Sequence, residues 1–240
     1  MQRLQRALSL IYPDQCLLCE ALVTTTGGLC AACWRDTPFI NGLVCDACGV
    51  PLPGQDAGAV LCDDCGALPR PWTRGRAVFA YRDVGRRIVL SLKHGDRTDL
   101  APAAAKWMAT AGAGLLADGP LLVPIPIHWT RRVTRRYNQA AELSRALARV
   151  AGLEHCPDAL IRTRRTDKLD GKTVDQRFAT LNDAVCAVEG RVKTVENRNV
   201  CLIDDVMTSG ATLTVATNAL LNAGAANVCV LVLARVEKAP

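Results

Sequence analysis

The sequence predicts an α/β fold in which a parallel sheet follows a small cysteine-rich module. Two observations support this prediction. Eight of the twelve cysteines lie in four CxxC pairs before residue 66. Beyond residue 71, apolar runs typical of buried strands alternate with stretches that have helical spacing. We therefore expect two units, residues 1–70 and 71–240, joined by a short proline-containing connection.

The CxxC pairs are arranged as metal ligands. In a CxxC turn two thiolates converge on one metal ion at about 2.3 Å, and two such turns close a tetrahedral site with no open position. The intervening loops, residues 20–29 and 49–61, are rich in Gly, Thr, Pro and Asp, which suits short turns. Two structural zinc sites are therefore predicted. In sequential order their ligands are Cys16, Cys19, Cys30 and Cys33, then Cys45, Cys48, Cys62 and Cys65. An interleaved arrangement of the same pairs stays open.

Other uses of these cysteines fit the sequence less well. A disulfide framework needs an oxidising compartment, and the first fifteen residues contain scattered arginines where a signal peptide has an apolar core. A redox pair needs one CxxC opening a helix, not four in tandem. An iron–sulfur cluster also uses four cysteines, but regular tandem CxxC spacing is more typical of zinc ribbons.

No stretch of the sequence reaches the roughly 18 apolar residues that a membrane-spanning helix needs. We therefore expect a cytoplasmic protein without a transmembrane segment. Leu4, Leu8 and Ile11 have helical spacing, which predicts a short amphipathic helix ending near Pro13. This helix either docks on the protein or lies on a membrane surface.

Basic residues exceed acidic residues, with 29 Lys and Arg against 23 Asp and Glu and a net charge of +6. The excess gathers in two patches. They are Arg131, Arg132, Arg135 and Arg136, then Arg162, Arg164, Arg165 and Lys168. Both patches indicate an anionic ligand, although solvated basic loops have the same composition.

The second unit alternates strands and helices. Strands are predicted at residues 77–81, 121–126, 200–204 and 228–234. Helices are predicted at residues 100–117, 137–152 and 211–224. Near-continuous apolar strands suit a parallel sheet covered on both faces. Because ligands of such sheets bind beyond the carboxyl ends of the strands, the residues that follow each strand are the candidates for a site.

The segment after the strand at residues 200–204 has the composition of a sugar-phosphate site. Asp204 and Asp205 are followed by a hydroxyl-rich turn and then by a helix, whose free N–H groups and positive dipole end favour a phosphate. The two acids suit the hydroxyls of a sugar or a metal ion that neutralises a diphosphate. The rest of the segment consists of Val206, Met207, Thr208, Ser209, Gly210, Ala211 and Thr212. A ribose phosphate fits both parts of the segment, because its hydroxyls suit the two acids and its phosphate suits the turn and helix.

The string VCLIDDVMTSGAT resembles the signature of the type I phosphoribosyltransferases, which is a buried strand, two acids and a TxGxT-like loop. The resemblance implies their parallel-sheet fold and phosphoribosyl pyrophosphate (PRPP) with Mg²⁺ as the ligand. It also implies that Asp204 and Asp205 hold the ribose 2′ and 3′ hydroxyls. Residues 208–212 would hold the 5′-phosphate.

Together with the cysteine module, the chain resembles the ComF family, in which a double zinc ribbon precedes such a domain. LLVPIPIHWTRRVTRRYNQAAELSRALA at residues 121–148 and LKHGDR at residues 92–97 carry this resemblance. It implies a pyrophosphate site at His128, Arg131, Arg132 and Arg135, with Arg136 as a further candidate. Lys93 either reaches the diphosphate or is a solvated lysine at a helix end. Residues 162–182 occupy the place of the mobile hood of the type I transferases, although their amino-acid sequence departs from the pattern common in the family.

The two resemblances imply transfer at the ribose anomeric carbon, assisted by Mg²⁺, and a role in DNA uptake or nucleotide salvage. The residues expected to act in catalysis are Asp204, Asp205, Lys93, Arg131 and Arg135. The alternative is a non-catalytic protein that binds single-stranded DNA or a partner of the uptake machinery and keeps the ribose-phosphate site as a sensor. In that case Trp34, Trp72 or Trp129 would stack on bases. The sequence indicates no acceptor base.

Overall fold

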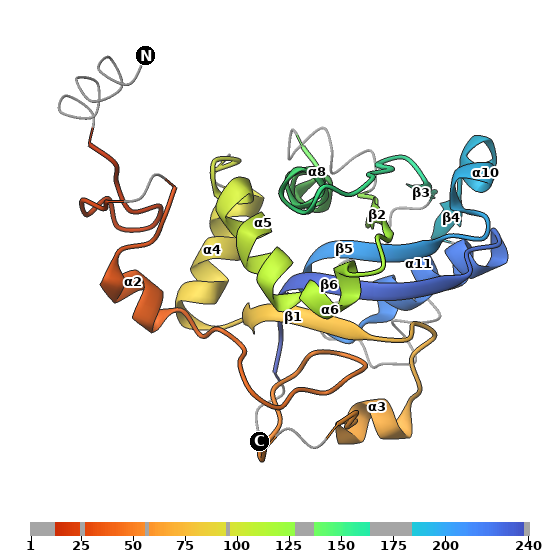
Figure 1. Ribbon diagram of the computed structural model, residues 1–240, viewed down its shortest axis with the longest axis horizontal. Helices are drawn as coiled ribbons and strands as arrows, with labels where there is room; N and C mark the ends of the chain where they lie inside the picture. The colour runs from red at the N-terminus through yellow and green to blue at the C-terminus, as the bar shows by residue number, and fades with distance from the viewer. Residues whose placement is uncertain are drawn as a thin grey trace.

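The computed structural model describes residues 13–24, 27–55, 58–94, 97–127, 137–163 and 184–237. A four-stranded sheet with the strand order β1-β6-β5-β2 forms its centre (Figure 1). The strands are β1 Gly75–Ala80, β2 Leu121–Pro124, β5 Asn199–Met207 and β6 Asn227–Arg235. Every neighbouring pair in this sheet is parallel. The predicted parallel α/β sheet is therefore confirmed.

Helices cover both faces of the sheet, because alternate strand residues are apolar on both sides. On one face Phe79 and Ile203 pack with Leu143 under three main helices. These helices are α4 Asp83–His94, α5 Leu100–Ala111 and α8 Gln139–Ala151. The short helix α6 Ala113–Leu116 follows α5 along the chain. On the other face Leu202 and Val230 pack against helix α11 Ala211–Asn222 and against part of the cysteine module.

The cysteine module packs directly on the edge strand β1. It contains two short helices, α2 Ala31–Asp36 and α3 Asp63–Ala67. The N–H of Ile40 donates to the carbonyl of Val78 (2.9 Å), and the N–H of Gly75 donates to that of Asp46 (2.8 Å). A Cβ at Gly75 would lie 2.4 Å from the carbonyl oxygen of Ala47, so this approach requires glycine.

Several boundaries differ from the predicted ones, among them the following three. The helix predicted at residues 100–117 is divided into α5 and α6 at Gly112, whose N–H returns to the carbonyl of Met108 (2.8 Å). Strand β5 continues through both acids to Met207 and does not end at Asp204. Helix α11 ends at Asn222, before the predicted Gly224.

Several elements were not among the predicted ones. They are α2, α3, α4, the antiparallel pair β3 Leu160–Arg162 and β4 Val185–Ala187, the 3₁₀ turn η1 Glu189–Arg191 and the short α10 Val192–Val195. The expected N-terminal helix lies outside the described residues, as does nearly all of the expected hood. Among the helices in the described ranges, none has the length and apolar character needed to cross a bilayer.

Candidate functional site

The two acids lie at the carboxyl end of β5, in the middle of the sheet. Asp205 is 9% exposed and Asp204 is half-buried. A carboxylate oxygen of Asp204 accepts a hydrogen bond from the N–H of Asp205 (2.8 Å). This end of the sheet is where open α/β folds bind ligands, so the predicted position of both acids agrees with the fold.

Two arginine side chains hold the turn after β5 through hydrogen bonds to its carbonyl groups. Arg235 donates to the carbonyls of Met207 (3.3 Å) and Thr208 (2.7 Å), and Arg70 donates to that of Ser209 (2.8 Å). In a trans peptide the N–H points away from the C=O. The N–H groups of the three following residues therefore point to the opposite side, as a phosphate-binding turn requires.

Gly210 connects this turn to α11. It adopts a left-handed conformation (φ 82°) as the N-cap of the helix, a region that glycine enters without a steric penalty. A Cβ here would also lie 3.1 Å from the ring of Trp72. The first turn of α11 therefore begins directly at the predicted phosphate loop, residues 208–212, and its first N–H, that of Ala211, donates to Oγ of Ser209 (3.4 Å).

Lys93 is brought to the acids by α4. Its Nζ lies 3.2 Å from Oδ1 of Asp205, and the two side chains are only 20% and 12% exposed. The structure therefore favours the site position for Lys93 over that of a solvated lysine at a helix end.

Burial, together with the neighbouring charge of Asp205, raises the pKa of Asp204 to about 7. Lys93 and Arg162 act against this shift through their positive charge. Near neutral pH the ligand-free site therefore holds a proton on Asp204 for part of the time. A ligand that supplies hydrogen-bond donors or a cation would favour the charged form.

Asp204→Asn is expected to stabilise the ligand-free protein more at high pH than at low pH. The folded protein keeps the proton up to about pH 7, whereas the unfolded chain releases it near the ordinary pKa of 3.8. The stability contributed by the neutral carboxyl is thus complete below the unfolded pKa and is lost as the pH rises through the folded pKa. Because the side chain is only half-buried, we expect a difference of about 1–2 kcal/mol between pH values of roughly 5 and 8. Urea unfolding of both proteins measures it, and an equal effect at the two pH values would contradict the raised pKa.

The eight CxxC cysteines form two groups of four, in sequential order. In each group the sulfur atoms lie within 4.8 Å of one another. The first cluster consists of Cys16, Cys19, Cys30 and Cys33, and the second of Cys45, Cys48, Cys62 and Cys65. Two sulfur pairs, Cys19 to Cys30 and Cys48 to Cys62, are separated by 3.5 and 3.8 Å. Four sulfurs around a zinc ion at about 2.3 Å would be about 3.8 Å apart, so both clusters fit zinc.

Other predicted site residues have different outcomes. His128, Arg131, Arg132, Arg135 and Arg136 lie outside the described residues, and so does Trp129. Trp72 does not offer a stacking surface: it is 3% exposed, because its ring packs beside Gly210 and its Nε1–H donates to the carbonyl of Ala47 (2.6 Å). Trp34 is 51% exposed, and its ring lies 4.5 Å from that of Phe39.

Arg70 and Arg235 were not predicted as site residues. Arg70 lies in the connection between the units, and Arg235 is the last residue of β6. Each contacts a turn far away in the sequence, so no local motif indicates its role. The only sequence signal is that Arg235 ends an otherwise apolar strand.

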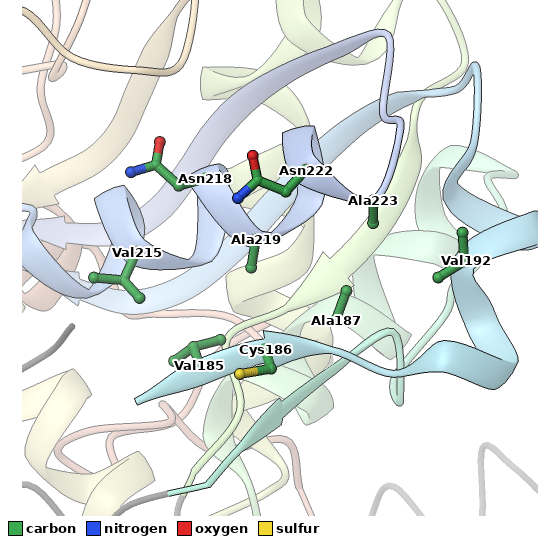
Figure 2. A pocket seen from close by; sticks show the side chains of 9 residues that line it. All are labelled: Val185, Cys186, Ala187, Val192, Val215, Asn218, Ala219, Asn222 and Ala223. Atoms are coloured by element: carbon green, nitrogen blue, oxygen red, sulfur yellow. The ribbon is translucent and has the colours of Figure 1, made fainter. Parts of the chain in front are cut away.

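A groove lies between β4 and α11 (Figure 2). Its volume is about 470 Å³. It is lined by Val185, Cys186, Ala187, Val192, Val215, Asn218, Ala219, Asn222 and Ala223. None of these side chains carries a charge, and none belongs to the turn after β5. The groove therefore does not fit a phosphate.

The clusters and the acid-loop-helix site on a parallel sheet define a class of protein: a double zinc ribbon joined to a phosphoribosyltransferase-like fold. A double zinc ribbon domain family matches residues 7–66. The DNA utilization protein YhgH of Shigella flexneri is 30% identical over 236 residues, 94% of this chain and 99% of that protein. The chain belongs to the ComF/YhgH family.

Two further likenesses were found. Competence protein ComFC of Bacillus subtilis strain 168 is 28% identical over 232 residues, 92% of this chain and 84% of that protein. Among solved structures, a hypoxanthine phosphoribosyltransferase from Staphylococcus aureus has a TM-score of 0.35 and 16% sequence identity. The match covers 57% of this chain and 68% of that one.

Proposed function

We propose that this protein binds PRPP with Mg²⁺ at the turn after β5 and uses it in a process connected with DNA utilization or competence. One observation carries the proposal. The carbonyls of residues 207–209 are held by two arginines, which directs the following N–H groups away from them, next to a pair of acids at the end of a central strand. A sugar that carries a phosphate fits this combination.

Each part of the site has a distinct role in this proposal. Asp204 and Asp205 accept hydrogen bonds from the ribose 2′ and 3′ hydroxyls, since carboxylates are acceptors only. Residues 208–212 donate to the 5′-phosphate. Lys93, already beside Asp205, lies within reach of the diphosphate. Mg²⁺ would neutralise charge on that diphosphate when bound.

We propose transfer at the anomeric carbon as the reaction, with pyrophosphate leaving. The bond from the anomeric carbon to the diphosphate oxygen breaks, and the bond to an acceptor forms. Positive charge develops on the ribose and negative charge on the leaving group, which is where cations stabilise a transition state. Lys93 is the described residue for this role, and His128, Arg131, Arg132 and Arg135 are proposed to complete it.

The names of the relatives support the biological setting. DNA utilization protein and competence protein are the names of proteins that match more than nine-tenths of this chain. We propose that the chain likewise serves DNA uptake or the use of its nucleotides, and that both cysteine clusters bind zinc as structural sites. Single-stranded DNA remains the alternative ligand, through the arginines of residues 131–136.

Replacing both acids is expected to weaken PRPP binding about a hundredfold, because two charged acceptors are lost. Calorimetry with PRPP and Mg²⁺ compares the wild type with the Asp204→Asn and Asp205→Asn double variant. Asp118→Asn is the matched control, since this exposed aspartate precedes β2 at the opposite end of the sheet. Unchanged affinity in the double variant would refute the site.

One further double variant, Arg131→Ala with Arg135→Ala, tests the alternative of single-stranded DNA binding. If PRPP does not bind but single-stranded DNA does, with an affinity that falls steeply with salt and is lost in Arg131→Ala with Arg135→Ala, backbone binding replaces the proposed function.

A further inference from the structure

The second cysteine cluster and the phosphate loop share two arginine side chains. Arg70 donates through Nε to Sγ of Cys65 (3.4 Å) and through Nη1 to the carbonyl of Ser209 (2.8 Å). Arg235 lies with Nη2 3.8 Å from Sγ of Cys48 and donates through Nη1 to the carbonyl of Thr208 (2.7 Å). Each guanidinium therefore bridges one ligand of the cluster and one carbonyl of the loop.

The charge of the metallated second cluster and the charge of the two arginines cancel. Four thiolates and one Zn²⁺ carry a net charge of −2, and two guanidinium groups supply +2. Arg235 is 5% exposed and Arg70 is half-buried, so neither charge is well solvated. A buried cation requires a nearby anion. The metallated second cluster supplies this anion, since each arginine contacts one of its sulfur atoms.

Trp72 also connects the second cluster with the phosphate loop. The indole N–H of Trp72 donates to the carbonyl of Ala47, which lies within the Cys45–Cys48 knuckle. The ring of Trp72 forms the wall behind Gly210, where even a Cβ would lie 3.1 Å from it. A displacement of the knuckle would therefore move the wall of the loop as well.

The first cluster has different surroundings. Its hydrogen bonds come from backbone groups of its own loop: the N–H of Cys30 donates to Sγ of Cys16 (3.2 Å), and that of Cys33 to Sγ of Cys30 (3.4 Å). The chain thus contains its own control, a second site of the same chemistry whose described sulfur contacts are to its own backbone and to one another.

We propose that Arg70 and Arg235 are positioning residues through which metal in the second cluster fixes the phosphate loop, so that ribose-phosphate binding and metal binding at this cluster strengthen each other. This inference rests on the proposed function. It adds a regulatory property to it: the chain binds PRPP well only while the second cluster is metallated. Thermodynamic linkage requires the effect to be reciprocal.

The reciprocal effect provides the test. Zinc release from the fully loaded protein to a chromophoric chelator is followed with and without PRPP and Mg²⁺. We expect two phases, of which PRPP slows only one by about tenfold. Cys19→Ser, in the first cluster, should remove the phase that PRPP does not affect and leave PRPP affinity unchanged. Loss of the protected phase instead would overturn the proposal.

Arg70→Gln is the decisive variant, because Arg70 is less buried than Arg235 and its replacement removes no metal ligand. We expect PRPP to bind about tenfold more weakly and no longer to slow zinc release, while zinc content stays at the wild-type value. Arg235→Gln is the second variant, checked first for unchanged circular dichroism. Arg76→Gln is the matched control: Arg76 also joins the ribbon to the sheet, through Asp46 (2.7 Å), but its described hydrogen bonds go to Asp46 and Gly75 and not to the loop.

The outcomes separate this inference from the proposed function. If the wild type binds PRPP and Arg70→Gln keeps both the affinity and the slowed zinc release, the coupling is wrong and the site stands. If Arg76→Gln weakens PRPP as much as Arg70→Gln does, the effect is general packing and the positioning role is wrong. If the wild type does not bind PRPP, both proposals fail.

Discussion

Removal of zinc from both clusters is expected to unfold the ribbon. The reason is the scarcity of apolar core in this segment: between residues 13 and 66 the buried residues are mostly the cysteines themselves, joined by Leu17, Thr37 and Ala47. Structural zinc sites of this kind contribute about 10–16 kcal/mol of apparent free energy near neutral pH. No other interaction of the described ribbon approaches this magnitude.

The two clusters should respond differently. Cys45 and Cys48 are fully buried and belong to the same core as Trp72, Ala77 and Val230 of the sheet. Loss of the second metal should therefore lower the melting temperature of the whole chain. Cys19 is exposed, and loss of the first metal should affect mainly its own loops.

Metal analysis and hydrogen exchange measure these effects. We expect two zinc ions per chain and, after chelation, rapid exchange across the ribbon while the amides of β5 and β6 remain protected longest. Cys19→Ser and Cys62→Ser give the comparison between clusters. Fewer than one zinc ion per chain in the purified protein would overturn the assignment of both sites.

The sequence was sufficient to predict those parts of the structure that local patterns determine. The apolar runs predict all four strands of the main sheet, and the CxxC spacing predicts two clusters of four cysteines, whose sequential order the structure decides. Helix α8 begins with Asn138, whose side chain accepts from the N–H of Ala140 (3.1 Å), and it ends at Gly152 in the left-handed conformation. These features depend on neighbours a few residues apart.

Long-range pairing explains what the sequence did not predict. Strand β5 continues past Asp204 because Val206 pairs with Ala234 and Met207 with Arg235 on β6, and polar residues interrupt the apolar pattern there. The contact from Arg70 to Ser209 joins residues 139 positions apart. Such contacts follow from the assembled fold, so a reading of local motifs finds the acids and the loop but not the arginines that hold them.

Trp72→Ala is expected to have the largest effect of any single substitution in the connection between the units. Truncation of a buried tryptophan costs about 3–5 kcal/mol, and the carbonyl of Ala47 would lose its donor, which costs about 1 kcal/mol more. The Trp72 ring packs in the core that the second cluster shares with the sheet. Its removal therefore leaves both the cluster and the loop at Gly210 without a side chain that packs against them. We expect lower stability and weaker PRPP binding together.

Denaturant unfolding and calorimetry on three variants resolve these contributions. Trp72→Phe keeps an aromatic ring but loses the hydrogen bond to Ala47, so its loss should be about 1–2 kcal/mol. Trp34→Ala is the matched control, because the same residue type is 51% exposed there and should cost less than about 2 kcal/mol. A Trp72→Ala protein as stable as Trp34→Ala would mean that the ribbon and the sheet do not share a core. The phosphate loop would then have to be held by Arg70 and Arg235 alone, and the affinity for PRPP should depend on them more steeply.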